Sequence, residues 1–97
     1  MKKGYWVVAY RSISDEVAMK NYVPLAITAL GKFGARPLVS PGSAVTAHEA
    51  GLKQMTVVIE FDSYEIAQAA YESSDYKKAL AALGSGAERD FRITEGV

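Results

Sequence analysis

The chain has 97 residues and no cysteine, and its eleven basic side chains balance eleven acidic ones. This length predicts a single domain over residues 1–97, and the lack of cysteine excludes disulfides, a thiolate nucleophile and a cysteine-based zinc site. The balanced charge is not that of a nucleic-acid binder, which needs a basic surface, and it gives no attraction to anionic membranes.

No targeting or membrane segment is expected from the start of the chain. Lys2 and Lys3 precede an apolar run of only about six residues, whereas the core of a signal peptide needs ~7–15. No apolar stretch approaches the ~20 residues of a membrane-spanning helix. We therefore expect a cytoplasmic protein.

The first predicted strand is the segment GYWVVAYR, residues 4–11. Successive side chains of a strand point to opposite faces. One face carries Tyr5, Val7 and Ala9, and the other carries Trp6, Val8 and Tyr10. Neither set is polar, so both faces need a cover. We assign the set that contains Trp6 to the face away from the helices, because Trp and Tyr have polar groups that suit a partly wet surface.

A helix is predicted over residues 15–33, because apolar side chains recur there at spacings of three and four. Ser14 or Asp15 is expected to cap its first turn. Pro24 has no N–H to donate to the carbonyl of Lys20, so we expect a kink or two abutting helical segments.

Two strands and two further helices follow. The segment ARPLVS, residues 35–40, is predicted at a sheet edge, because Pro37 cannot donate to a strand ladder. Residues 44–48 could extend this edge as a short ribbon. The segment MTVVIEF, residues 55–61, is the clearest strand. A helix is predicted to follow, with Asp62 as its N-cap and Glu65 completing a capping box. A second helix is predicted to begin after a cap at Ser73 and to end at Gly84.

The segment ERDFRITEGV, residues 88–97, completes the chain as a strand, with Phe91 and Ile93 on one face. The resulting order predicts a ferredoxin-like α+β fold, β-α-β-β-α-β, with an antiparallel sheet in the spatial order four, one, three, two. Helices then cover one face only. The sheet face without helices is expected to carry apolar side chains, which predicts a homodimer by sheet-to-sheet packing, with a cavity that a small molecule could occupy.

The segments YWVVAY, YVPLA, FGARPLVSPG, VVIEFDSYEIAQAAYESSDYKKAL and AERDFRITEGV resemble the domain of unknown function 1330 family over nearly the whole chain. The resemblance implies a dimeric α/β barrel, a group that includes small monooxygenases and isomerases, and it implies no particular activity. Many relatives carry a basic residue where this chain has Leu83. Others continue with RGG where it has Ser40–Gly42, so anion binding by those residues is not implied here.

Glu60 is the candidate catalytic residue. It is a mid-strand carboxylate between Ile59 and Phe61 on the expected dimer side, where burial would raise its pKa and suit it to general acid–base chemistry. The more common alternative is an ion pair with Arg92. Arg92 could instead hold a substrate carboxylate.

The candidate ligand-binding residues are Trp6, Tyr10 and Arg92. His48 is the only histidine, without a second ligand at metal-binding spacing, so no metal site and no cofactor are expected. Two function classes stay open. One is a cofactor-independent enzyme, of isomerase or monooxygenase type, that acts on a small organic molecule. The other is a non-catalytic ligand-binding or structural dimer.

Overall fold

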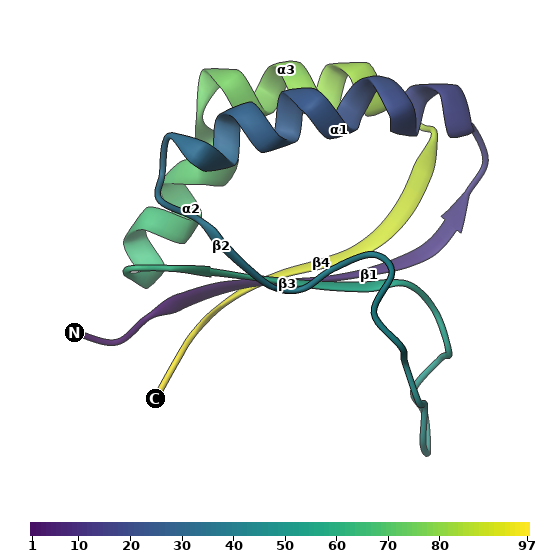
Figure 1. The fold of residues 1–97 in the computed structure, drawn as a ribbon, viewed down its shortest axis with the longest axis horizontal. Helices are drawn as coiled ribbons and strands as arrows, with labels where there is room; N and C mark the ends of the chain where they lie inside the picture. Colours follow the sequence, from purple (N-terminus) through teal and green to yellow (C-terminus); the bar gives the residue numbers. More distant parts are fainter.

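Four antiparallel strands form one sheet, and three helices cover one of its faces, in the computed structural model, which describes residues 1–97 (Figure 1). The strands are β1 (Gly4–Ile13), β2 (Arg36–Val39), β3 (Thr56–Phe61) and β4 (Ala87–Glu95). The helices are α1 (Glu16–Gly31), α2 (Tyr64–Glu72) and α3 (Ser74–Leu83). The spatial order is β2-β3-β1-β4, so the predicted α+β fold and the edge position of the Pro37 strand are confirmed.

Helix α1 begins at the predicted cap and runs through Pro24. The Asp15 carboxylate accepts hydrogen bonds from the amides of Val17 and Ala18, at 3.1 and 3.0 Å. The alternative of two abutting segments is wrong, because Glu16–Gly31 form one helix. Its buried stripe of Tyr22, Ala26 and Ala29 continues across the proline. Packing of this stripe therefore holds the helix together where proline removes one backbone hydrogen bond.

Two local predictions after the second strand are wrong. Ser63, not Asp62, caps α2, since its hydroxyl accepts the amide of Ile66 at 3.1 Å. Residues 44–48 form no ribbon, because β2 ends at Val39 and residues 40–55 form a loop on the side of the sheet away from the helices (Figure 1). A hydrogen bond of 3.1 Å from the Ser40 amide to the Ser43 side chain turns the backbone there.

The face assignment of β1 is also wrong. Trp6, Val8 and Tyr10 face the helices and are only 1, 3 and 8% exposed. The register places Trp6 beside Ile59 of β3, whose side chain lies in the core. The indole N–H donates to the Ala67 carbonyl of α2 at 2.8 Å, so the polar group that suggested a wet surface is bonded inside the core.

Trp6 is the centre of an aromatic cluster in this core. Its ring lies between 4.9 and 6.1 Å, centre to centre, from four others. The four partners are Phe61, Tyr71, Tyr76 and Phe91. Helices α2 and α3 are therefore attached to the middle of the sheet through one tryptophan.

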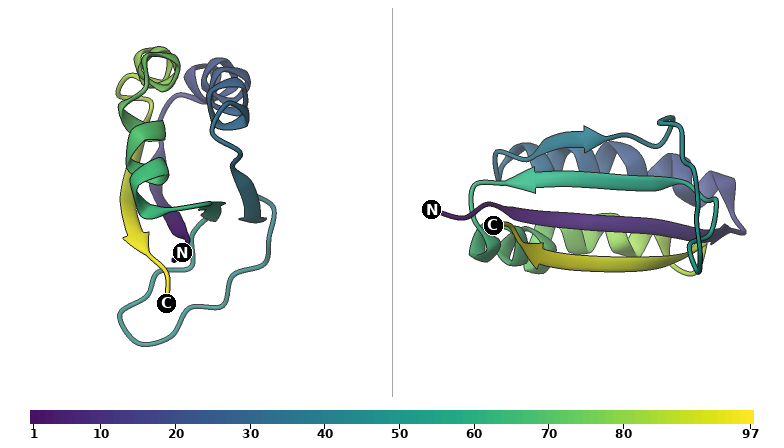
Figure 2. Two further views of the ribbon diagram at one scale, coloured as in Figure 1. Left: turned by 90° about the vertical axis from the view of Figure 1, so that its left-hand side faces the viewer. Right: turned by 90° about the horizontal axis from the view of Figure 1, so that it is seen from below.

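The opposite sheet face has no helix over it, as Figure 2 shows from below. We call it the open face. It carries Tyr5, Val7 and Ala9 of β1, with Thr56, Val58 and Glu60 of β3 and Asp90, Arg92 and Thr94 of β4. None of the three helices is long and apolar enough to cross a membrane.

Candidate functional site

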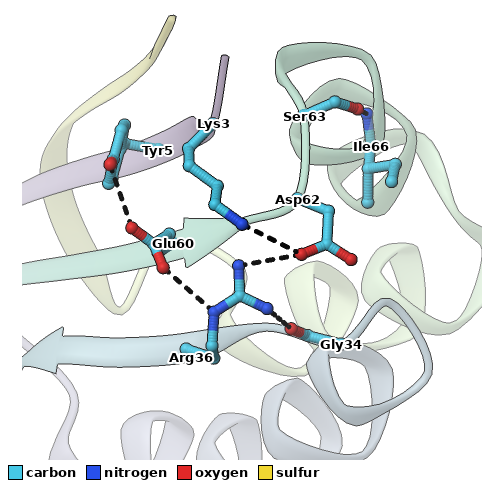
Figure 3. Close-up of polar contacts among 8 residues, drawn as sticks. All are labelled: Lys3, Tyr5, Gly34, Arg36, Glu60, Asp62, Ser63 and Ile66. Carbon is cyan, nitrogen blue, oxygen red and sulfur yellow. Dashed lines mark hydrogen bonds and ion pairs between the residues drawn. The ribbon is translucent and has the colours of Figure 1, made fainter. Parts of the chain in front are cut away.

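Glu60 lies on the open face between two side chains from neighbouring strands (Figure 3). Tyr5 of β1 and Arg36 of β2 are its direct partners in the two strand pairings. The Tyr5 hydroxyl donates to Oε2 at 2.9 Å, and Nε of Arg36 donates to Oε1 at 3.0 Å. Both oxygens of the carboxylate are therefore engaged.

Arg36 joins Glu60 to a second carboxylate, that of Asp62. Its Nη2 lies 3.0 Å from Oδ1 of Asp62, and its Nη1 donates to the Gly34 carbonyl at 3.0 Å (Figure 3). Lys3 approaches the same Asp62 oxygen at 3.5 Å. Two cations and two carboxylates thus form a compact ionic cluster at one end of the open face.

This environment keeps Glu60 ionised. The hydrogen bond from Arg36, followed by that from Tyr5, lowers the pKa of its carboxyl below the usual value. The same guanidinium lowers the pKa of Asp62. A carboxylate with a lowered pKa and two occupied oxygens is a poor general acid and a weak general base near neutral pH.

The expected contact between Glu60 and Arg92 is wrong. Arg92 pairs instead with Asp90 of its own strand, with Nε 3.0 Å from Oδ1, and its side chain is 73% exposed. Strand β1 separates the two strands, and Val7 is the residue opposite Arg92. The edge strand β2, by contrast, places Arg36 directly beside Glu60.

On the helix side, a pocket of about 450 Å³ lies between α1 and the sheet; we call it the α1 pocket. Eleven of its fifteen lining residues are hydrophobic. The helix supplies Tyr22, Ala26 and Leu30, the central strands supply Tyr10, Val57 and Ile59, and β2 supplies Pro37 and Val39. This volume is in the range of ~300–1,000 Å³ that small-molecule sites occupy.

Tyr22, which lines the α1 pocket, belongs to a tyrosine–arginine cluster behind it. The hydroxyls of Tyr22 and Tyr76 lie 2.7 Å apart, and Nη1 of Arg89 donates to them at 3.1 and 3.3 Å. Burial raises the pKa of Tyr22 and of Tyr76, and also that of the adjacent Tyr10. The three phenols are therefore neutral near physiological pH.

The structure separates the four residues that the sequence analysis grouped. Trp6 is enclosed by the core and has no surface left for a ligand. Tyr10 lines the α1 pocket. Glu60 and Arg92 lie on the open face, on the other side of the sheet. The catalytic and binding roles assigned to them stay predictions, and no single cavity contains all four.

Sequence reasoning missed Tyr5 and Arg36 as partners of Glu60, and Tyr22 and Arg89 beside the pocket. The sequence did indicate the position of Arg89. Arg89 and Phe91 are two residues apart in one strand, so they share a face, and the face of Phe91 is predicted to meet the helices. A charged residue on an apolar face is informative. No three acidic or histidine side chains gather into a metal-binding group, and His48 is exposed in the loop.

The comparisons with known proteins agree with this fold. Residues 3–97 match a family described as domain of unknown function 1330. A protein of unknown function from Rhodopseudomonas palustris aligns with a TM-score of 0.73 and 9% identity, over 99% of this chain and 83% of its own. No curated protein matches the sequence significantly.

Two further solved structures carry descriptions beyond their fold. A candidate antibiotic biosynthesis monooxygenase from Caulobacter crescentus CB15 aligns with a TM-score of 0.63 and 17% identity, over 99% of this chain and 92% of its own. A dimeric ferredoxin-like protein of unknown function from Thermobifida fusca aligns with a TM-score of 0.52 and 18% identity, again over 99 and 92%. At these identities the likeness shows the ferredoxin-like fold alone.

Proposed function

The chain belongs to the domain of unknown function 1330 family, and we propose that it works as a homodimer that binds a small, mainly apolar organic molecule in the α1 pocket. The observation that carries this proposal is the pocket itself, about 450 Å³ with eleven hydrophobic lining residues. Apolar walls favour an apolar ligand, since each Å² removed from water contributes roughly 25 cal/mol.

The dimer is proposed to form through the open face. Val7 and Val58 are neighbours in the β1–β3 register, and both are partly exposed at the centre of this face. A second copy related by a two-fold axis would cover them. Glu60 tolerates such burial, because its ion pair with Arg36 prevents an uncompensated charge. The Thermobifida fusca protein is described as dimeric, which supports a dimer as such.

A monooxygenase reaction is the first activity to assay. Two of the similar structures are described as candidate antibiotic biosynthesis monooxygenases. In the proposed reaction one oxygen atom of O₂ enters the substrate, and the other leaves as water with two hydrogens from the substrate. The substrate thus supplies the electrons. Glu60 is not proposed as its base, because Glu60 lies across the sheet from the α1 pocket.

Thermal shift with a panel of small aromatic and aliphatic compounds tests the binding proposal. A compound that binds the folded state raises its unfolding temperature. Ala26→Leu should fill the pocket and abolish the shift, although the larger side chain costs about 1–3 kcal/mol of stability. Ala81→Leu, on the exposed side of α3, is the matched control and should keep the shift.

Two outcomes would contradict the proposal. One is a panel in which no compound stabilises the protein. The other is an equal shift in Ala26→Leu and the wild type, which would put the binding site elsewhere. Oxygen consumption with the stabilising compounds then tests for monooxygenase activity, and chromatography of each compound after incubation tests for isomerisation.

A further inference from the structure

Arg89 is a cation in the layer between sheet and helices, and it has no acidic partner. It lies beside Tyr10 in the β1–β4 register, on the same face of β4 as Phe91. No carboxylate oxygen lies within 4.0 Å of its guanidinium, although every other arginine in the chain has such a partner. Its positive charge therefore lacks a formal counter-charge.

Aromatic rings and phenol oxygens surround this cation instead. Its central carbon lies 5.7, 5.2 and 5.1 Å from the ring centres of Tyr10, Tyr22 and Phe91. Ring faces attract a cation at such distances. Because burial keeps the phenols protonated, they solvate the charge but do not neutralise it. The guanidinium thus contacts neutral groups only.

The α1 pocket is where a negative group could arrive. Tyr10 and Tyr22 line both the pocket and the surroundings of Arg89. The Tyr22 hydroxyl is engaged by Tyr76 and Arg89. The Tyr10 hydroxyl makes no hydrogen bond of 3.5 Å or less, although Tyr22 and Arg89 lie close enough to it to shift its pKa. Its proton is therefore available to a ligand oxygen in the pocket that Tyr10 lines.

We infer that the α1 pocket selects an apolar molecule that carries one acidic oxygen, a phenolate or a carboxylate, which binds the Tyr10 hydroxyl in the field of Arg89. This inference rests on the proposed function, because it requires a ligand in the α1 pocket. A charge-assisted hydrogen bond in an apolar site is stronger than a neutral one, and the guanidinium gains its missing counter-charge. Arg89 acts here as a specificity-determining residue.

The test compares each acidic probe with a neutral compound of the same shape. 2-Naphthoate is matched by 2-acetylnaphthalene, and 4-nitrophenolate by 4-nitrotoluene, at a pH where the nitrophenol is ionised. Dissociation constants are measured by calorimetry. We expect the wild type to bind at least one acidic probe about tenfold more tightly than its neutral match. The pair that shows the larger preference identifies the oxygen as carboxylate or phenolate.

Variants then locate the origin of this preference. Arg89→Gln and Tyr10→Phe should each bring the ratio of the neutral to the acidic dissociation constant close to one, while the neutral compounds still bind. Arg11→Gln, on the outer side of β1, is the matched control and should keep the preference. Tyr10→Phe alone decides the question if Arg89→Gln does not fold, because it removes only a hydroxyl.

Equal binding of acidic and neutral probes by the wild type would overturn the inference and leave the proposed function standing. A preference that survives in both variants would overturn it too, because the selecting charge would then lie elsewhere. Failure of all four probes to bind would count against both the inference and the proposed function.

Discussion

Glu60 and Arg36 face each other across β3 and β2, with Oε1 of the carboxylate 3.0 Å from Nε of the guanidinium. The pair lies at the sheet edge, and Arg36 continues from it to Asp62. Because β2 has only four residues and a register shift at Pro37/Val39, its pairing with β3 is short. We therefore infer that the side-chain contacts of Arg36 help to hold β2 on β3.

Glu60→Gln should lower the free energy of unfolding at neutral pH, and the difference from wild type should vanish in acid. The folded state lowers the pKa of Glu60, so its stabilisation is present above the unfolded value of about 4.3 and is lost as pH falls through the folded value. Urea unfolding of the wild type and the variant, at neutral and at acidic pH, measures this difference in free energy. Glu49→Gln, in the exposed loop, is the control; an equal loss in both variants would contradict the prediction.

Val7→Glu should convert the proposed dimer to a folded monomer. The substitution places a carboxylate at the centre of the open face, beside Val58, where two such charges would meet across the two-fold axis. Sedimentation velocity at micromolar concentration should show the mass of one chain for the variant and of two for the wild type. Val17→Glu, on the exposed surface of α1, should remain dimeric. A monomeric wild type would disprove the prediction.

Trp6→Ala should destabilise the protomer by about 3–5 kcal/mol, the usual cost of removing a large buried aromatic side chain. The loss includes four ring contacts and the hydrogen bond to Ala67. Trp6→Phe keeps a ring but loses the bond, so it should cost less. Trp6→Glu should unfold the chain, whereas an effect on association alone would mean that Trp6 faces the partner. Urea unfolding and sedimentation distinguish these results.

Pro24→Ala should stabilise α1 by up to about 3 kcal/mol, because alanine restores the amide that can donate to the Lys20 carbonyl. Pro24 is exposed, so the substitution removes no core packing. Part of the gain is offset by the greater freedom of the unfolded chain. Urea unfolding checks the sign. A destabilised variant would show instead that the proline ring is required for the local helix geometry.

Local sequence signals were enough to predict the helices and strands and their order. Pro37 predicted the edge strand because a missing donor is a local property of the residue, and it holds in any fold. Ser73, and Asp15 as one of two expected caps beside Ser14, predicted helix starts for the same reason, since a cap bonds amides two or three residues away. These signals act over a few residues and are visible without tertiary information.

The buried face of β1 and the cation that pairs with Glu60 depend on contacts between segments far apart in the chain. Both side-chain sets of β1 are apolar, so alternation alone cannot choose between them. Pairing with Ile59 places Trp6 in the core. The sequence pattern suggested only Arg92 as the partner of Glu60, whereas the edge register places Arg36 beside it. The α1 pocket likewise exists only once the helix lies on the sheet, because its walls come from segments far apart in the chain.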